Sequence, residues 1–207
     1  GARRGECVVV FMKKCPATVA AFFSVIYAVC CYVPLEMGLP MHRIRRIIAK
    51  LEPRTVICDE SSAEKCAELG YGDRILPAEE LFSCEAGPEL SAVRRKCVDI
   101  DPVYIVFTSG STGEPKGVTA CHRSLIDYAS ALCPVIGAQV PLYVDACMKE
   151  ILSAVKCGST VFLMQQSLFT SPLNVLSFLN EHKINTVCWV ASALTLVSGL
   201  GAFEEGR

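Results

Sequence analysis

The sequence predicts an α/β fold, with mostly parallel sheets flanked by helices. Short runs rich in β-branched residues alternate with longer runs of helical spacing, as in parallel strands joined by crossover helices. One run, residues 103–107 (VYIVF), is apolar throughout, as a strand buried on both faces would be. Apolar residues make up 52% of the 207-residue chain and charged residues 20%, which provides enough apolar material for a core.

The first hundred residues predict alternating strands and helices. Pro16 opens the first helix, because the missing amide of proline costs little in a first helical turn. Ile44, Ile47 and Ile48 recur at three- and four-residue spacing, which predicts an amphipathic helix whose arginines form a solvated face. We expect strands at 7–11, 32–33, 55–58 and 74–76, and helices at 16–29, 41–51, 61–70 and 78–82.

Residues 83–100 are the least patterned part of the chain. They contain Gly87-Pro88 and a run of three basic residues, so we expect a surface connection and a lobe boundary there. Beyond this segment we expect strands at 103–107, 160–164 and 186–189, and helices at 145–157, 172–182 and 191–198.

Charge and cysteine content argue against several classes of protein. The 20 basic residues nearly cancel the 21 acidic ones, so no electrostatic case for nucleic-acid binding exists. The 13 cysteines are scattered and no CxxC pair occurs, so we expect neither a disulfide scaffold nor a metal site. We expect the protein to reside in a reducing cytoplasm. The uncharged residues 17–35 are long enough for a short membrane span, but a strand precedes them, and we expect no membrane segment.

A phosphate-binding loop is predicted immediately after the strand at 103–107. Its glycines leave backbone amides bare, its hydroxyls add donors, and its lysine adds a mobile positive charge. The order of residues differs from that of a P-loop and of a GxGxxG fingerprint. The alternative interpretation is a glycine- and serine-rich surface turn. The expected nucleotide-binding residues are Thr108, Ser109, Gly110, Ser111, Thr112, Gly113, Lys116 and Gly117.

Two segments resemble the adenylate-forming (AMP-binding) superfamily, which includes acyl-CoA synthetases and the adenylation domains of peptide synthetases. Residues 104–118 (YIVFTSGSTGEPKGV) are similar to its signature loop, and residues 28–44 (AVCCYVPLEMGLPMHRI) to another of its segments, with Glu36 in place of an aspartate. The resemblance implies ATP and Mg²⁺ as cofactors. It also implies that Lys116 acts catalytically, by stabilising charge on the departing pyrophosphate.

A third segment, residues 143–147 (YVDAC), resembles the amino-acid-activating branch of the superfamily. The resemblance implies that Asp145 holds the α-ammonium group of an amino-acid substrate. The alternative is that Asp145 caps a helix or complements its dipole. Residues 177–194 (SFLNEHKINTVCWVASAL) are similar to D-alanine-carrier-protein-ligase-like domains of the same branch.

The resemblance covers residues 1–207 as the N-terminal part of one adenylation domain, and implies that the C-terminal domain with its catalytic lysine is absent. It implies ATP-dependent activation of an amino-acid or other small carboxylate, followed by transfer to the phosphopantetheine thiol of a carrier protein. The chain alone is expected to be inactive. The alternatives are an acyl-CoA or aryl-acid synthetase, and a non-catalytic nucleotide-binding remnant. His122, just after the loop, is expected to be structural.

Overall fold

The computed structural model describes residues 3–109, 113–129 and 135–199. The chain divides into two compact units, residues 1–124 and 125–207. Residues 83–100, where the sequence indicated a lobe boundary, lie inside the first unit. Gly110, Ser111 and Thr112 of the predicted phosphate loop lie outside the described residues.

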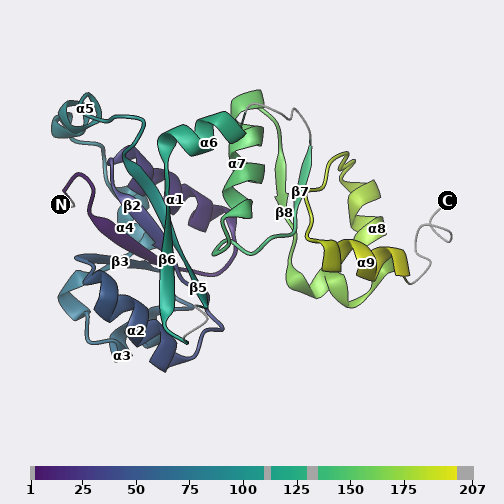
Figure 1. Ribbon diagram of the computed structural model, residues 1–207, viewed down its shortest axis with the longest axis horizontal. Coiled ribbons are helices and arrows are strands. Elements are labelled where there is room, and N and C mark those ends of the chain that lie inside the picture. The colour runs from purple at the N-terminus through teal and green to yellow at the C-terminus, as the bar shows by residue number, and fades with distance from the viewer. Residues whose placement is uncertain (1–2, 110–112, 130–134, 200–207) are drawn as a thin grey trace. The chain divides into compact units, whose positions relative to one another are not determined.

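The first unit is built on a sheet whose described strands follow the order β4-β3-β1-β2-β5-β6 (Figure 1). The strands β1 to β5 run parallel, whereas β6 pairs antiparallel with β5. The strands are β1 (Cys7–Phe11), β2 (Cys31–Pro34), β3 (Thr55–Cys58), β4 (Ile75–Pro77), β5 (Pro102–Ser109) and β6 (Pro115–Cys121). The helices are α1 (Pro16–Tyr27), α2 (Met41–Leu51), α3 (Ala63–Glu68), α4 (Ala78–Ser83) and α5 (Pro88–Arg94), with a 3-10 turn at Gly72–Arg74. Helix α6 (His122–Tyr128) begins at the end of the first unit and continues into the second.

Helices cover both faces of this sheet, with α1 on one side and α2 and α3 on the other (Figure 1). Alternate residues of a strand point to opposite faces, so each buried strand contributes to two layers of the core. Val9 and Val33 pack with Ile44 and Ile47 of α2. On the other face, the ring of Tyr32 stacks on Phe22 of α1, with the ring centroids 4.2 Å apart.

The second unit contains a β-α-β crossover. Strand β7 (Ile136–Ala138) pairs parallel with β8 (Val161–Leu163), and α7 (Ala146–Cys157) connects them. Helices α8 (Pro172–Glu181) and α9 (Ala191–Gly199) follow, with a 3-10 segment at Gln166–Thr170 before them. Met164, Val175 and Val197 form a small buried cluster in this unit.

The α/β class and its mostly parallel sheet are confirmed, and several elements differ from the sequence expectation. The first helix ends at Tyr27 rather than near Val29, because Val29 takes a φ of 56° that no α-helix can continue. Residues 186–189 are not a strand: only a single bridge joins Thr186 to Ile136. Strands β6 and β7 and helices α5 and α6 were not predicted.

Candidate functional site

The predicted phosphate loop joins the two strands of an antiparallel hairpin. Thr108 and Ser109 end β5, Lys116 and Gly117 lie near the start of β6, and Thr108 is paired with Lys116 in the ladder. Gly113 has a φ of +78°, which L-residues with a side chain rarely adopt. The hairpin therefore brings together the residues on either side of the loop that the sequence predicted as phosphate-binding.

The two faces of the hairpin differ in character. Directly paired residues of antiparallel strands point to the same face, so Thr108 and Lys116 share one face and Phe107 and Gly117 the other. The hydroxyl of Thr108 donates to the carbonyl oxygen of Lys116 at 3.5 Å, and both residues are exposed. One face of the hairpin thus carries Thr108 and Lys116 as directly paired, exposed residues.

Gly117 is required by packing on the opposite face. A Cβ atom at this position would lie 2.8 Å from Cγ2 of Ile105 and 3.3 Å from Cζ of Phe107. Both of these side chains pack against the core that β1, β2 and α2 share. The glycine therefore leaves room beside β5 for the side chains of Ile105 and Phe107.

Two basic residues of α2 hold the start of β6, and the sequence expectation missed them. Nζ of Lys50 donates to the carbonyl oxygen of Pro115 at 3.2 Å. Nη1 of Arg46 lies 3.3 Å from Oε1 of Glu114. The arginines of this helix had been interpreted only as a solvated face. The signal that could have indicated the contact is the spacing of four between residues 46 and 50, which places both on one side of the helix.

Asp145 lies in the second unit, immediately before α7. It occupies the N-cap position, but its side chain makes no capping hydrogen bond. Its carboxylate instead lies 3.6 Å from Nζ of Lys149 and is 54% exposed. The Asp145 carboxylate is therefore partly exposed to solvent at the start of α7, with the ammonium group of Lys149 as its neighbour.

His122 begins α6 next to the end of the hairpin. Its main-chain amide donates to the carbonyl oxygen of Asp101 at 3.2 Å, and its Nε2 lies 3.7 Å from the sulfur of Cys97. These contacts join the end of β6 to the segment that precedes β5. They give the residue a structural part in the first unit.

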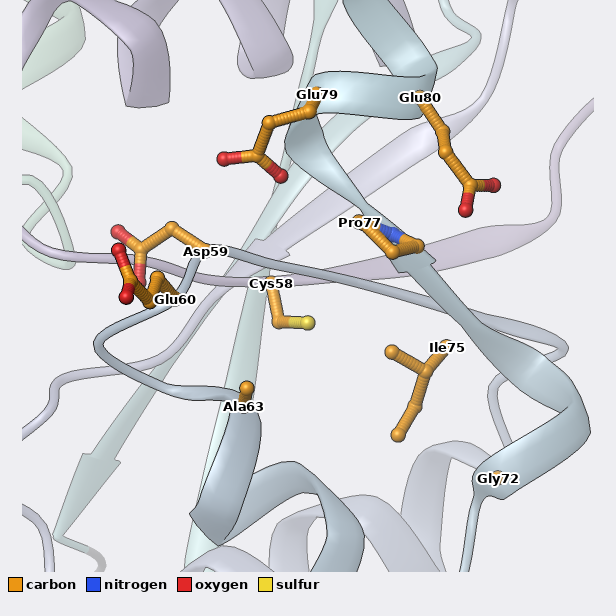
Figure 2. A pocket seen from close by; sticks show the side chains of 9 residues that line it. All are labelled: Cys58, Asp59, Glu60, Ala63, Gly72, Ile75, Pro77, Glu79 and Glu80. Atoms are coloured by element: carbon orange, nitrogen blue, oxygen red, sulfur yellow. The ribbon is translucent and has the colours of Figure 1, made fainter.

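A hollow of about 700 Å³ opens at the carboxyl ends of β3 and β4, where open α/β sheets commonly bind ligands (Figure 2). Figure 2 shows Asp59, Glu60, Glu79 and Glu80 among its lining residues. Such an acidic lining repels a polyphosphate, and none of the predicted site residues belongs to it. This hollow is therefore a poor candidate for a nucleotide site.

Asp59 already serves a structural purpose at the edge of this hollow. Its carboxylate accepts hydrogen bonds from the main-chain amides of Lys13 and Ser62, both at 3.1 Å. Partial burial raises the pKa of Asp59, but hydrogen bonds from Ser61, Lys13 and Ser62 outweigh it and hold the pKa below its ordinary value. The charged carboxylate thus joins the loops after β1 and β3.

The described residues contain no group of three or more His, Cys, Asp or Glu side chains that could hold a metal ion. We accordingly assign Mg²⁺ no ligand from these residues. All cysteines in the described part of the chain are free thiols. None of the helices described here has the length and apolar character that crossing a membrane requires.

Comparison with known proteins gives the family of this α/β chain. The family model of AMP-binding enzymes matches residues 1–205, and the chain belongs to this family. Indigoidine synthase of Streptomyces lavendulae is 28% identical over 211 residues, which cover 97% of this chain and 16% of that protein. The D-alanine–D-alanyl carrier protein ligase of Staphylococcus aureus is 28% identical over 195 residues, which cover 89% of this chain and 38% of that protein. The chain thus spans well under half the length of these relatives.

Solved structures share the fold at lower identity. The N-terminal domain of FACL13 from Mycobacterium tuberculosis, solved with an inhibitor, has a TM-score of 0.81 and 21% identity, covering 100% of this chain and 55% of that one. AB3403, a four-domain nonribosomal peptide synthetase bound to AMP and glycine, has a TM-score of 0.77 and 21% identity. That match covers 96% of this chain and 15% of AB3403.

Proposed function

We propose that this chain is part of an enzyme that activates an amino-acid carboxylate with ATP and passes the acyl group to the thiol of a phosphopantetheinyl carrier protein. The observation that carries the proposal is the hairpin, with Thr108 and Lys116 exposed on one face. The likeness to a D-alanine carrier-protein ligase and to peptide synthetases supports an amino acid as the substrate. A cytoplasmic location belongs to the proposal, because free thiols remain reduced there.

The proposed reaction has two steps. A carboxylate oxygen attacks the α-phosphorus of ATP and forms a C–O–P bond, while the bond to pyrophosphate breaks and its electron pair leaves with pyrophosphate. The carrier thiolate then attacks the acyl carbon and AMP departs with the electrons of the broken C–O bond. Magnesium bound with ATP would neutralise part of the phosphate charge.

The chain's own residues would contribute electrostatics and positioning. The ammonium group of Lys116 would stabilise the negative charge that moves onto pyrophosphate. The Thr108 hydroxyl, which donates to the Lys116 carbonyl oxygen in this structure, would rotate away from that acceptor to donate to a phosphate oxygen. Asp145 would hold the α-ammonium group of the amino acid in a charge-assisted bond. Gly110, Ser111 and Thr112 complete the proposed loop by resemblance.

The test is ATP–pyrophosphate exchange by the full-length protein that carries this chain, with amino acids, aryl acids and fatty acids compared as substrates. Exchange that depends on an amino acid supports the proposal. Exchange with only aryl or fatty acids would assign the chain to the acyl-CoA or aryl-acid synthetases. A protein that binds ATP but exchanges with none of them would be a non-catalytic remnant.

A further inference from the structure

We propose that Lys50, assisted by Arg46, is a positioning residue that fixes the strand bearing Lys116 so that its ammonium group faces the phosphates of ATP. Neither α2 side chain needs to touch the nucleotide, because both act through the start of β6. The inference rests on the proposed function, since it names residues that support the same phosphate site.

The bond from Lys50 acts on the residue next to Lys116. Nζ of Lys50 lies 3.2 Å from the carbonyl oxygen of Pro115, a buried residue paired with Ser109 in the ladder. Pro115 is the first residue of β6, and proline has no amide hydrogen with which to anchor the strand there. A charge-assisted bond to the Pro115 carbonyl therefore restrains the strand at its start, next to Lys116.

Arg46 acts one turn earlier on the same side of α2. Its guanidinium lies 3.3 Å from the carboxylate of Glu114, and both side chains are more than half exposed. An exposed pair of this kind contributes little to stability and weakens with salt. Its second effect is electrostatic: it partly neutralises a carboxylate two residues from Lys116 that would repel a polyphosphate. Arg46 is therefore the weaker of the two supports.

The two faces of the hairpin separate support from binding. Pro115 and Gly117 share the face that packs toward α2, whereas Lys116 and Thr108 lie on the opposite face. Lys50 reaches β6 from the α2 side. Removing its ammonium group would loosen the strand without removing a group from the face that presents Lys116.

The chain supplies matched controls for both residues. Lys65 also donates from Nζ to a main-chain carbonyl, that of Met37, at 2.6 Å, and is remote from the hairpin in the sequence. Arg45, the neighbour of Arg46, donates to the carbonyl oxygen of Glu68 at 3.1 Å. Lys50→Met and Lys65→Met keep an apolar stem and remove one ammonium group each, and Arg46→Gln is compared with Arg45→Gln.

The measurement is the affinity of the full-length protein that carries this chain for ATP and for inorganic tripolyphosphate. We expect Lys50→Met to weaken both about three- to tenfold, which is less than the loss of a direct charge-assisted bond because Lys50 acts through the strand, and Lys50→Arg to restore most of the loss. Arg46→Gln should weaken both about twofold at low salt and less at high salt. Lys65→Met and Arg45→Gln should leave both affinities unchanged.

A double-mutant cycle with Lys116→Ala distinguishes positioning from direct binding. If Lys50 acts through Lys116, Lys50→Met should have little further effect in the Lys116→Ala background. Amide hydrogen exchange of residues 116–118, measured without ligand, should be faster in Lys50→Met than in the wild-type chain and unchanged in Lys65→Met.

Three outcomes would overturn the inference alone: a Lys50→Met chain that binds as tightly as wild type, additive losses in the cycle, or an equal loss in Lys65→Met. A wild-type full-length protein that binds neither ATP nor tripolyphosphate would instead overturn the proposed function, and the inference with it.

Discussion

The ammonium group of Lys149 lies 3.6 Å from the carboxylate of Asp145, one helical turn further along α7. Nζ of Lys149 also lies 4.6 Å above the ring of Tyr128, so two neighbours hold it. The Asp145 side chain is 54% exposed, and an ion pair this exposed contributes little to stability. A substrate ammonium that excludes water from the carboxylate could therefore displace Lys149.

We predict that Asp145→Asn in the full-length protein impairs the use of the amino acid much more than the use of ATP. Loss of a charge-assisted bond to the substrate ammonium should cost about 1.5–3 kcal/mol in kcat/KM for the amino acid. Steady-state kinetics with each substrate varied in turn would measure this. An unchanged kcat/KM for the amino acid would leave Asp145 only a role at the start of α7.

Lys149→Met provides the control for this prediction. It removes the competing ammonium group and keeps Asp145, so affinity for the amino acid should stay the same or rise slightly. If Lys149→Met instead abolished the use of the amino acid, the lysine rather than the aspartate would contact the substrate.

We predict that Lys116→Ala in the full-length protein slows single-turnover adenylate formation by about ten- to a hundredfold, a loss of about 1.4–2.7 kcal/mol. ATP affinity should change less, because the charge that Lys116 faces increases as pyrophosphate departs. Lys116→Arg should recover the rate only in part, since a planar guanidinium differs in shape from an ammonium group. If Lys116→Ala greatly weakened ATP binding but left the rate of adenylate formation from bound ATP unchanged, Lys116 would bind the ground state of ATP rather than stabilise the transition state.

We predict that Gly117→Ala destabilises the first unit. The new Cβ would lie 2.8 Å from Ile105 and 3.3 Å from Phe107, so β6 or these side chains must shift. Overpacking of this kind costs about 1–3 kcal/mol in the free energy of unfolding, which urea denaturation would measure. Gly72→Ala is the matched control, because nothing lies within 4 Å of its Cβ and it should change stability by less than about 0.5 kcal/mol. Equal stability of the two variants would refute the packing role of Gly117.

We predict that Cys7 is alkylated at lower pH than an ordinary thiol. Cys7 and Cys31 are partners on adjacent parallel strands, and a hydrogen bond from Cys31 lowers the pKa of Cys7 to about 7, although burial opposes this shift. The rate of iodoacetamide labelling of Cys7 should therefore reach half its maximum near pH 7. Mass spectrometry of the labelled peptide would give the profile.

Two comparisons control the cysteine experiment. In Cys31→Ala, the midpoint for Cys7 should move toward the ordinary thiol pKa of 9.0, because the hydrogen-bond donor is lost. Cys66 is buried, which raises its pKa to about 12, so it should remain unlabelled throughout. A midpoint for Cys7 that ignored the Cys31 substitution would disprove the hydrogen bond as the cause.

The sequence predicted the parallel part of the sheet well because each element there carries a local signal. The apolar residues of β1 alone predicted its bounds, and the spacing of Ile44, Ile47 and Ile48 gave α2. The strand β6 was missed for a physical reason. Its residues Lys116, Gly117 and Thr119 are exposed and polar or lack a side chain, so the strand exists through pairing with β5 rather than through its own composition.

The sequence indicates the residues of the candidate site but not the residues of α2 that contact it. The glycines and hydroxyls of the loop are close in sequence, so the sequence alone can indicate a phosphate-binding loop. The contact of Lys50 with Pro115 joins residues 65 positions apart and depends on how α2 packs beside the hairpin. The spacing of residues 46 and 50 places two basic side chains on one side of α2, but the sequence does not say which segment they contact, and only the fold supplies that partner.

The position of β6 at the edge of the sheet determines how the site can respond to a nucleotide. Among the described strands, β6 has β5 as its only neighbour, whereas β1, β2 and β3 are each paired on both sides. Opening the hairpin breaks only the ladder between β5 and β6 and leaves the central strands paired. The free energy of opening the hairpin should therefore be lower than the free energy of unfolding the whole unit. In the proposed reaction, the strand that carries Lys116 would therefore be able to shift as the phosphate geometry changes, while the central strands of the unit stay paired.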